Sequence, residues 1–272
     1  MNAPELLFPR ARAAVLPDVQ ASADGRGVAI QKVGVRDVRY PVRLRAAGGG
    51  AQSTLGVFQM TVALPPEVKG THMSRFIEVL EAHDAELDAV ALGDLLDTML
   101  LRLQAGAGSI SLRSTYFLRK TAPVSGVSSL LDYGVCLQAE HDGAQRVVRQ
   151  TVEVPVTSLC PCSRDISEYG AHNQRSVITI GAELRGSLSL DEQIAFAEQA
   201  ASCQLWGLLK RPDEKYVTEY AYDHPKFVED LVRDVALALG SERRIAAYTV
   251  ASENFESIHN HSAYAWLEGR NP

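Results

Sequence analysis

Hydrophobic and polar positions along this chain follow two periods, one typical of strands and one typical of helices. Over residues 33–44, β-branched side chains alternate with charged ones, as expected of a half-buried strand. Over residues 87–103, apolar side chains recur every three or four positions, as on the buried face of a helix. The same patterns predict the order strand-strand-helix-helix-strand-strand for the first half, with strands at 33–44, 55–64, 109–119 and 129–141 and helices at 74–83 and 87–103.

The second half repeats this outline, with predicted strands at 146–157, 177–184, 244–254 and 263–267 and predicted helices at 190–209 and 227–239. Ser189 and Glu192 have the spacing of a capping box, which marks where the first of these helices begins. Two copies of one α+β outline indicate an internal duplication. We therefore expect an N-terminal arm over residues 1–27 and two antiparallel-sheet units over 28–145 and 146–272.

Composition narrows the class of protein. The chain has 272 residues, of which 46% are hydrophobic and 22% charged, as in an ordinary globular protein. Its net charge of -6 argues against broad nucleic-acid binding, which requires a basic footprint. No apolar run approaches the roughly 20 residues that span a bilayer. Residues 1–10 also lack a basic segment followed by an apolar core, so we expect a cytoplasmic protein with reduced thiols.

The densest group of reactive side chains is a Cys-Pro-Cys motif followed by a histidine. Cys160 and Cys162 are two of the four cysteines, and Pro161 between them favours an extended segment in which both thiols point the same way. His172 follows ten residues after Cys162, and a thiolate with an imidazole suits Zn²⁺ or a similar divalent ion. The motif also has a purely structural explanation, in which both cysteines are small buried apolar residues and His172 is an ordinary turn residue. A metal-free Cys–His nucleophile is the main chemical alternative.

Other polar clusters supply candidates for the rest of a site. Glu214 offers an oxygen ligand, and we expect the carboxylate of Glu229 to lie at the edge of the core. His259 and His261, two residues apart, are suited to metal binding or proton transfer. In the first half, a helix N-terminus with Ser74 as its expected N-cap carries two cations suited to phosphate binding, Lys69 and Arg75. Each of these residues also has a plain interpretation as a surface charge or an ordinary helix cap.

Three of these segments, 70–76, 159–175 and 253–261, together resemble the type IB GTP cyclohydrolases, the FolE2 family, over about residues 30–270. The resemblance implies a tunnelling fold, with two antiparallel-sheet units that each carry paired helices on one face. It implies assembly into a homotetramer through barrel formation. It also implies conversion of GTP and water to 7,8-dihydroneopterin triphosphate and formate, the first step toward tetrahydrofolate.

The resemblance further assigns roles to individual residues. It implies a divalent metal (Mn, Zn or Fe) held by Cys160, His172 and Glu214. It implies that Glu229 anchors the guanine edge, and it makes His259 and His261 the proton-transfer residues. The triphosphate would be held by basic residues, namely Lys69, Arg75 and either Arg175 or Arg244. Cys162 receives no role.

Two other functions remain open at this point. A metal-free tunnelling-fold enzyme, such as a nitrile reductase, would use the thiol as a nucleophile. A non-catalytic pterin-binding or metal-storage protein would bind without turnover.

Overall fold

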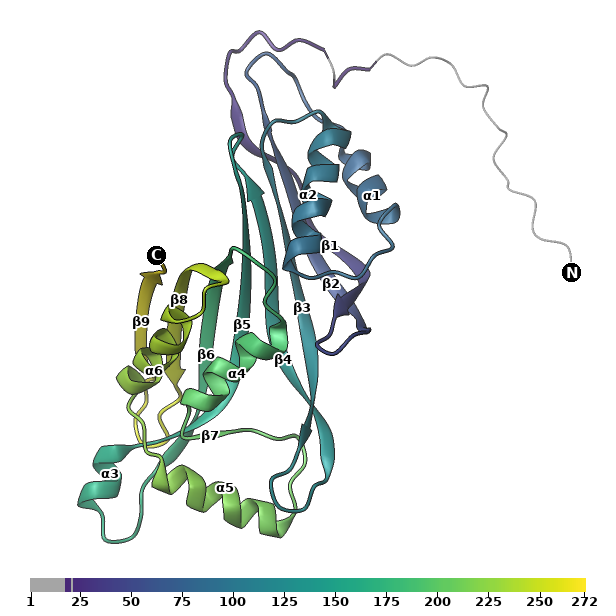
Figure 1. Ribbon diagram of the computed structural model, residues 1–272. Helices are drawn as coiled ribbons and strands as arrows, with labels where there is room; N and C mark the ends of the chain where they lie inside the picture. Colours follow the sequence, from purple (N-terminus) through teal and green to yellow (C-terminus); the bar gives the residue numbers. More distant parts are fainter. Residues whose placement is uncertain (1–17, 21) are drawn as a thin grey trace, which may run out of the picture.

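The protein is built on one long antiparallel sheet (Figure 1). The computed structural model describes residues 18–20 and 22–272, so the expected arm over residues 1–27 lies largely outside the described residues. The sheet order is β1-β2-β3-β4-β5-β6-β8-β9, and the short β7 pairs with β5. The strands are β1 (Ile30–Arg45), β2 (Ala51–Leu64), β3 (Gly108–Thr121), β4 (Ser128–His141), β5 (Arg146–Leu159), β6 (Asn173–Leu184), β7 (Cys203–Gln204), β8 (Ile245–Asn254) and β9 (Ala263–Arg270).

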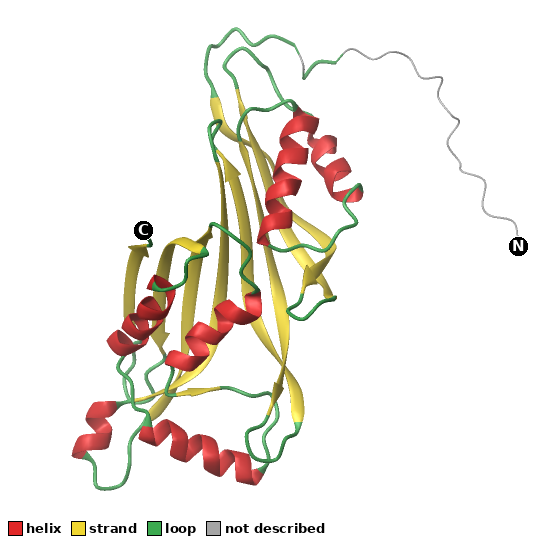
Figure 2. Ribbon diagram, viewed as in Figure 1, coloured by secondary structure: helices red, strands yellow, loops and turns green. Residues whose placement is uncertain are grey.

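Four helices pack as two pairs on one face of the sheet (Figure 2). The first pair is α1 (Met73–Glu81) and α2 (Ala89–Leu103), and the second is α4 (Leu190–Ala200) and α6 (Val228–Gly240). Two more helices, α3 (Pro161–Ile166) and α5 (Arg211–Asp223), lie at one end of the sheet (Figure 1). The expected α+β arrangement, with paired helices on one face, is confirmed.

The core lies between the sheet and the helix pairs because alternate strand residues point toward the helices. In β4, Tyr133, Val135 and Leu137 are buried, while the residues between them are more exposed. Their partners on α2 include Leu92, Leu96 and Met99, which recur at helical spacing and are fully buried. The two periods in the sequence therefore mark the two sides of one core.

Predicted helix boundaries differ from the structure at several ends, and the largest difference is in the helix expected over 190–209. The helix expected over 190–209 begins where the capping box of Ser189 and Glu192 predicts, but it ends at Ala200. Residues 203–204 form β7 instead, because they pair with β5. The helix expected to begin after Ser74 as its N-cap begins two residues earlier, because His72 is the N-cap residue.

The sheet runs without interruption from the first half into the second, because β4 and β5 pair from Gly134↔Glu153 to His141↔Arg146. The expected division between residues 145 and 146 falls at the turn that joins these two strands. The division into two units stays a prediction. None of the described helices is long and apolar enough to cross a membrane.

Candidate active site

Cys160 lies where β5 ends and α3 begins. Pro161 occupies the first turn of α3, a position where its missing N–H costs nothing, and Cys160 is the N-cap residue. The extended backbone expected over 159–162 is confirmed for Leu159 and Cys160, but it is wrong for Pro161 and Cys162, which begin α3. Because Cys162 is helical, the alternation of an extended segment that was expected to point both thiols the same way does not apply. Cys160 is half-buried, whereas Cys162 is exposed.

His172 is held beside Cys160 by backbone and hydroxyl contacts. The backbone N–H of Cys160 donates to the His172 carbonyl oxygen at 3.2 Å. The Ser163 hydroxyl donates to the Cys160 carbonyl at 3.1 Å and accepts from the His172 N–H at 3.2 Å. The turn before His172 contains Gly170 with a φ of 108°, a conformation that favours glycine. The structure therefore places the backbones of Cys160 and His172 side by side.

The His172 ring contacts two side chains that were not predicted as site residues, Gln174 and Ser257. Its Nδ1 lies 3.0 Å from Oε1 of Gln174 and 3.3 Å from Oγ of Ser257. The Gln174 amide in turn donates to Oε1 of Glu256 at 3.3 Å. The sequence pattern that could have identified Gln174 is its alternation in β6 with Ser176 and Ile178, which places it on the buried face of the strand. A polar residue in phase with a buried apolar face needs a polar partner.

Glu229 lies at the N-terminal end of α6, near the end of β5 that leads into Cys160. The backbone N–H of Lys226 donates to the Leu159 carbonyl at 3.0 Å, which fixes the start of α6 beside this strand end. Val228 and Leu231 are buried, but the side chain of Glu229 is exposed. Its carboxylate is therefore accessible to a ligand.

His259 and His261 lie in the exposed loop between β8 and β9. Their rings stack with centroids 5.3 Å apart. The start of this loop is tied to the strand that carries His172, because the Phe255 N–H donates to the Arg175 carbonyl at 3.0 Å. Arg175 itself is exposed on β6.

Glu214 lies in the first turn of α5, away from Cys160 and His172. The other end of α5 is the part that approaches α3, because the Arg164 guanidinium lies 5.1 Å from the ring of Tyr222. Eight residues of helix separate Tyr222 from Glu214, a rise of about 12 Å. Among the described residues, no group of three or more His, Cys, Asp and Glu side chains is gathered closely enough to hold a metal.

The first turn of α5 is fixed by Asp213, which is fully buried. Its carboxylate accepts the Val124 and Ser125 N–H groups at 2.8 Å each and the Ser125 hydroxyl at 2.6 Å. It also accepts the Lys210 N–H at 2.8 Å. Burial alone would raise the pKa of Asp213, but these hydrogen bonds outweigh it and hold the pKa well below its usual range.

Lys69 and Arg75 lie far from Cys160 within one chain. Arg75 is in the first turn of α1 and lines a pocket of about 580 Å³ with Ser74 and Arg102. Lys69 is exposed in the segment before α1. The helix that packs beside α1 is α2. Asp94 and Asp97 of α2 each form an ion pair with Arg146, the first residue of β5, whereas Cys160 follows the last residue of that strand. The 14 residues from there to Cys160 span about 45 Å of strand.

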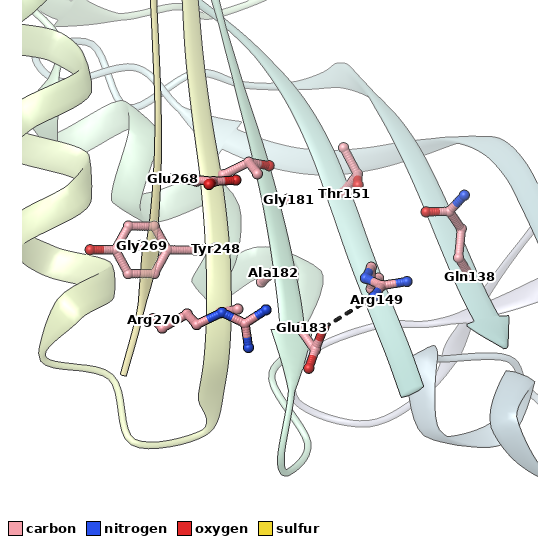
Figure 3. A pocket seen from close by; sticks show the side chains of 12 residues that line it. Gln138, Arg149, Thr151, Gly181, Ala182, Glu183, Tyr248, Glu268, Gly269 and Arg270 are labelled. Carbon is pink, nitrogen blue, oxygen red and sulfur yellow. Dashed lines mark hydrogen bonds and ion pairs between the residues drawn. The ribbon is translucent and has the colours of Figure 1, made fainter. Parts of the chain in front are cut away.

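A polar groove of about 500 Å³ lies on the helix-free face of β4, β5, β6, β8 and β9 (Figure 3). Gly181 lines this groove and has no side chain to fill it, and any larger residue would clash, because its Cβ would lie 2.6 Å from Oγ1 of Thr249. Arg149 and Glu183 form an ion pair of 3.2 Å in the groove. None of the residues predicted for the site lines it.

Comparisons with known proteins point to one family. The model of the family described as "Type I GTP cyclohydrolase folE2" matches residues 16–265. A protein named GTP cyclohydrolase FolE2 1, from Dechloromonas aromatica (strain RCB), is 59% identical over 274 residues, and the match covers 100% of each chain. GTP cyclohydrolase FolE2 2 from Cupriavidus metallidurans is 59% identical over 254 residues, covering 93% of this chain and 95% of the relative.

Solved structures share the fold at low sequence identity. A highly active mutant of Bacillus sp. TB-90 urate oxidase superposes with a TM-score of 0.51 and 7% identity, covering 89% of this chain and 100% of that chain. At this identity the likeness shows the fold alone, and that fold is the tunnelling fold.

Proposed function

Because the chain belongs to the FolE2 family of type I GTP cyclohydrolases, we propose that it converts GTP and water to 7,8-dihydroneopterin triphosphate and formate. The observation that supports this most directly is the family match over residues 16–265, which includes every residue predicted for the site. The pairing of Cys160 with His172 at the end of β5 is consistent with it.

The donor set at this strand end suits a divalent cation such as Mn²⁺, Zn²⁺ or Fe²⁺. Cys160 offers a half-buried thiol, and His172 offers the ring nitrogen that Gln174 does not engage. When bound, such a cation would lower the pKa of water toward neutrality and polarise the reacting bond. Glu214 is proposed as the third ligand, and its separation from Cys160 in one chain indicates that it is supplied when chains assemble.

The remaining residues act on the substrate. The exposed carboxylate of Glu229 can accept hydrogen bonds from both the ring N–H and the exocyclic amine of a guanine edge. His259 and His261 are proposed to move protons during ring opening and formate release, because neutral imidazole both donates and accepts near pH 7. Arg175 lies one residue from Gln174 and faces solvent, where it can contact a phosphate.

We also propose that the protein works as a homo-oligomer, a tetramer in the family's barrel arrangement. The helix beside Arg75 contacts the end of β5 that lies about 45 Å of strand away from Cys160, which supports this, since one chain does not bring the phosphate-binding and ring-opening residues to one substrate. A cytoplasmic location is part of the proposal, because a reducing compartment keeps the Cys160 thiol free to bind a metal.

The test is formate release from GTP by the purified protein, measured after chelation and again after adding Mn²⁺, Zn²⁺ or Fe²⁺. We expect no formate after chelation and its recovery with at least one metal. Activity that survives complete chelation would favour the metal-free Cys nucleophile. Absence of formate with every metal would contradict the proposed function and favour a binding protein.

A further inference from the structure

Gln174 is a buried amide held between a histidine and a carboxylate. Only 8% of the residue is exposed, although it is the second residue of β6. Its Oε1 lies 3.0 Å from Nδ1 of His172, and its Nε2 lies 3.3 Å from Oε1 of Glu256. Both polar ends of the amide therefore have a partner, as a buried amide requires.

The carboxylate fixes the direction of this chain of hydrogen bonds. An ionised carboxylate only accepts, so Glu256 binds the NH₂ end of the Gln174 amide. The oxygen end then faces His172, and an amide oxygen also only accepts. The proton of the neutral His172 ring must therefore be on Nδ1, which leaves the lone pair on Nε2.

Ser257 does not set this direction. Its hydroxyl lies 3.3 Å from the same Nδ1, but a hydroxyl rotates and serves either as donor or as acceptor. Ser257 is also exposed, so water can replace it. Of the two groups at Nδ1, only Gln174 distinguishes between the two tautomers of the ring.

We propose that Gln174 is a positioning residue for His172, which holds the ring proton on Nδ1 so that Nε2 is presented to a divalent cation. Glu256 acts one step further out, by orienting the Gln174 amide. The inference rests on the metal site of the proposed function. Groups that orient a ligating histidine in this way typically contribute about 10–100-fold to metal affinity.

The first test replaces the amide by an apolar side chain of similar size, Gln174→Leu. Imidazole ¹⁵N NMR of the metal-free protein reports the tautomer of His172, and competition with a chromophoric chelator reports Mn²⁺ affinity. We expect the Nδ1–H tautomer in the unmodified protein, a mixture of tautomers in Gln174→Leu, and an affinity about 10–100-fold lower. Ser257→Ala is the matched control at the same nitrogen and should leave both readouts nearly unchanged.

A second variant separates orientation from simple loss of packing. Gln174→Glu alone places two carboxylates together and should weaken metal binding. The exchange Gln174→Glu with Glu256→Gln restores a donor beside an acceptor, so the Nδ1–H tautomer and most of the Mn²⁺ affinity should return. Because Glu and Gln have nearly the same size, a role in packing alone would leave the metal affinity of Gln174→Glu intact.

The inference is overturned if Gln174→Leu, shown by circular dichroism to be folded, keeps the tautomer and the metal affinity of the unmodified protein. It is also overturned if Ser257→Ala lowers affinity as much as Gln174→Leu. Formate release from GTP is measured on the same preparations. Loss of the proposed function would appear as no formate from the unmodified protein, whatever the tautomer, so the two failures are distinguishable.

Discussion

Cys160 and Cys162 stand two residues apart in different surroundings, and this difference predicts different effects on substitution. Cys160 is half-buried beside His172, whereas Cys162 is exposed on α3. We expect Cys160→Ala to abolish metal binding and formate release, because a ligand is lost, while circular dichroism and thermal unfolding stay close to those of the unmodified protein. Cys162→Ala is the control and should retain metal and activity. Equal loss in both variants would contradict the assignment.

Glu229 gives a second prediction at the residue scale. Its exposed carboxylate is proposed to accept two hydrogen bonds from the guanine edge, and hydrogen bonds to a charged group contribute about 1.5–3 kcal/mol. Glu229→Gln should therefore raise the KM for GTP by roughly 10–100-fold. Steady-state kinetics and metal analysis check this. An unchanged KM, or a lost metal, would show that the residue has another role.

At the scale of single elements, the start of α5 depends on Asp213. We expect Asp213→Asn to lower the melting temperature by several degrees at pH 7, because the amide cannot replace an acceptor of four hydrogen bonds. Glu219→Gln is the control on the same helix, since its ion pair with Lys215 is exposed and contributes little.

The same carboxylate predicts a pH dependence. Its pKa is lower in the folded state than the usual value of about 3.9, so its contribution is complete above that value and is lost as the pH falls through the folded-state pKa. The difference in melting temperature between Asp213→Asn and the unmodified protein should be constant from about pH 7 to pH 5 and narrow in stronger acid. A difference that grows on acidification would contradict this assignment.

Element types were largely predictable from the sequence, because strand alternation and helical spacing mark the buried faces directly. Strand β4, expected over 129–141, spans Ser128–His141. The errors occur where other interactions outweigh the local pattern. The apolar pattern predicts that α4 continues to residue 209, but residues 203–204 pair with β5 as a strand, so the helix ends at Ala200. Pro161 begins α3, although an extended segment was expected there. Proline breaks a helix only in its interior and is favoured in the first turn.

The whole-molecule arrangement of the site was less accessible to sequence reasoning. Only α3 and a turn separate Cys160 from His172, so their closeness in the sequence suggested their proximity. The position of Gln174 in the hydrogen-bonded group depends on the β8–β9 loop folding back onto β6, which no local pattern records. The positions of Glu214, Lys69 and Arg75 relative to a substrate depend on how chains assemble, and they stay predictions.

Assembly predicts complementation between defective chains. Arg75→Ala and Cys160→Ala should each be inactive, because one affects phosphate binding and the other the metal. If each site takes Arg75 from one chain and Cys160 from another, hetero-oligomers purified by two different tags should recover a measurable part of the formate release. Hetero-oligomers that contain both chains but remain inactive would contradict a shared site.

An anomalous-difference map from crystals of the Mn²⁺-loaded protein would show whether a catalytic metal is bound at Cys160 and His172. We expect a single strong peak per chain between Sγ of Cys160 and Nε2 of His172, with a carboxylate completing the ligands. A peak at another place, or a peak bonded to Nδ1 of His172, would contradict it.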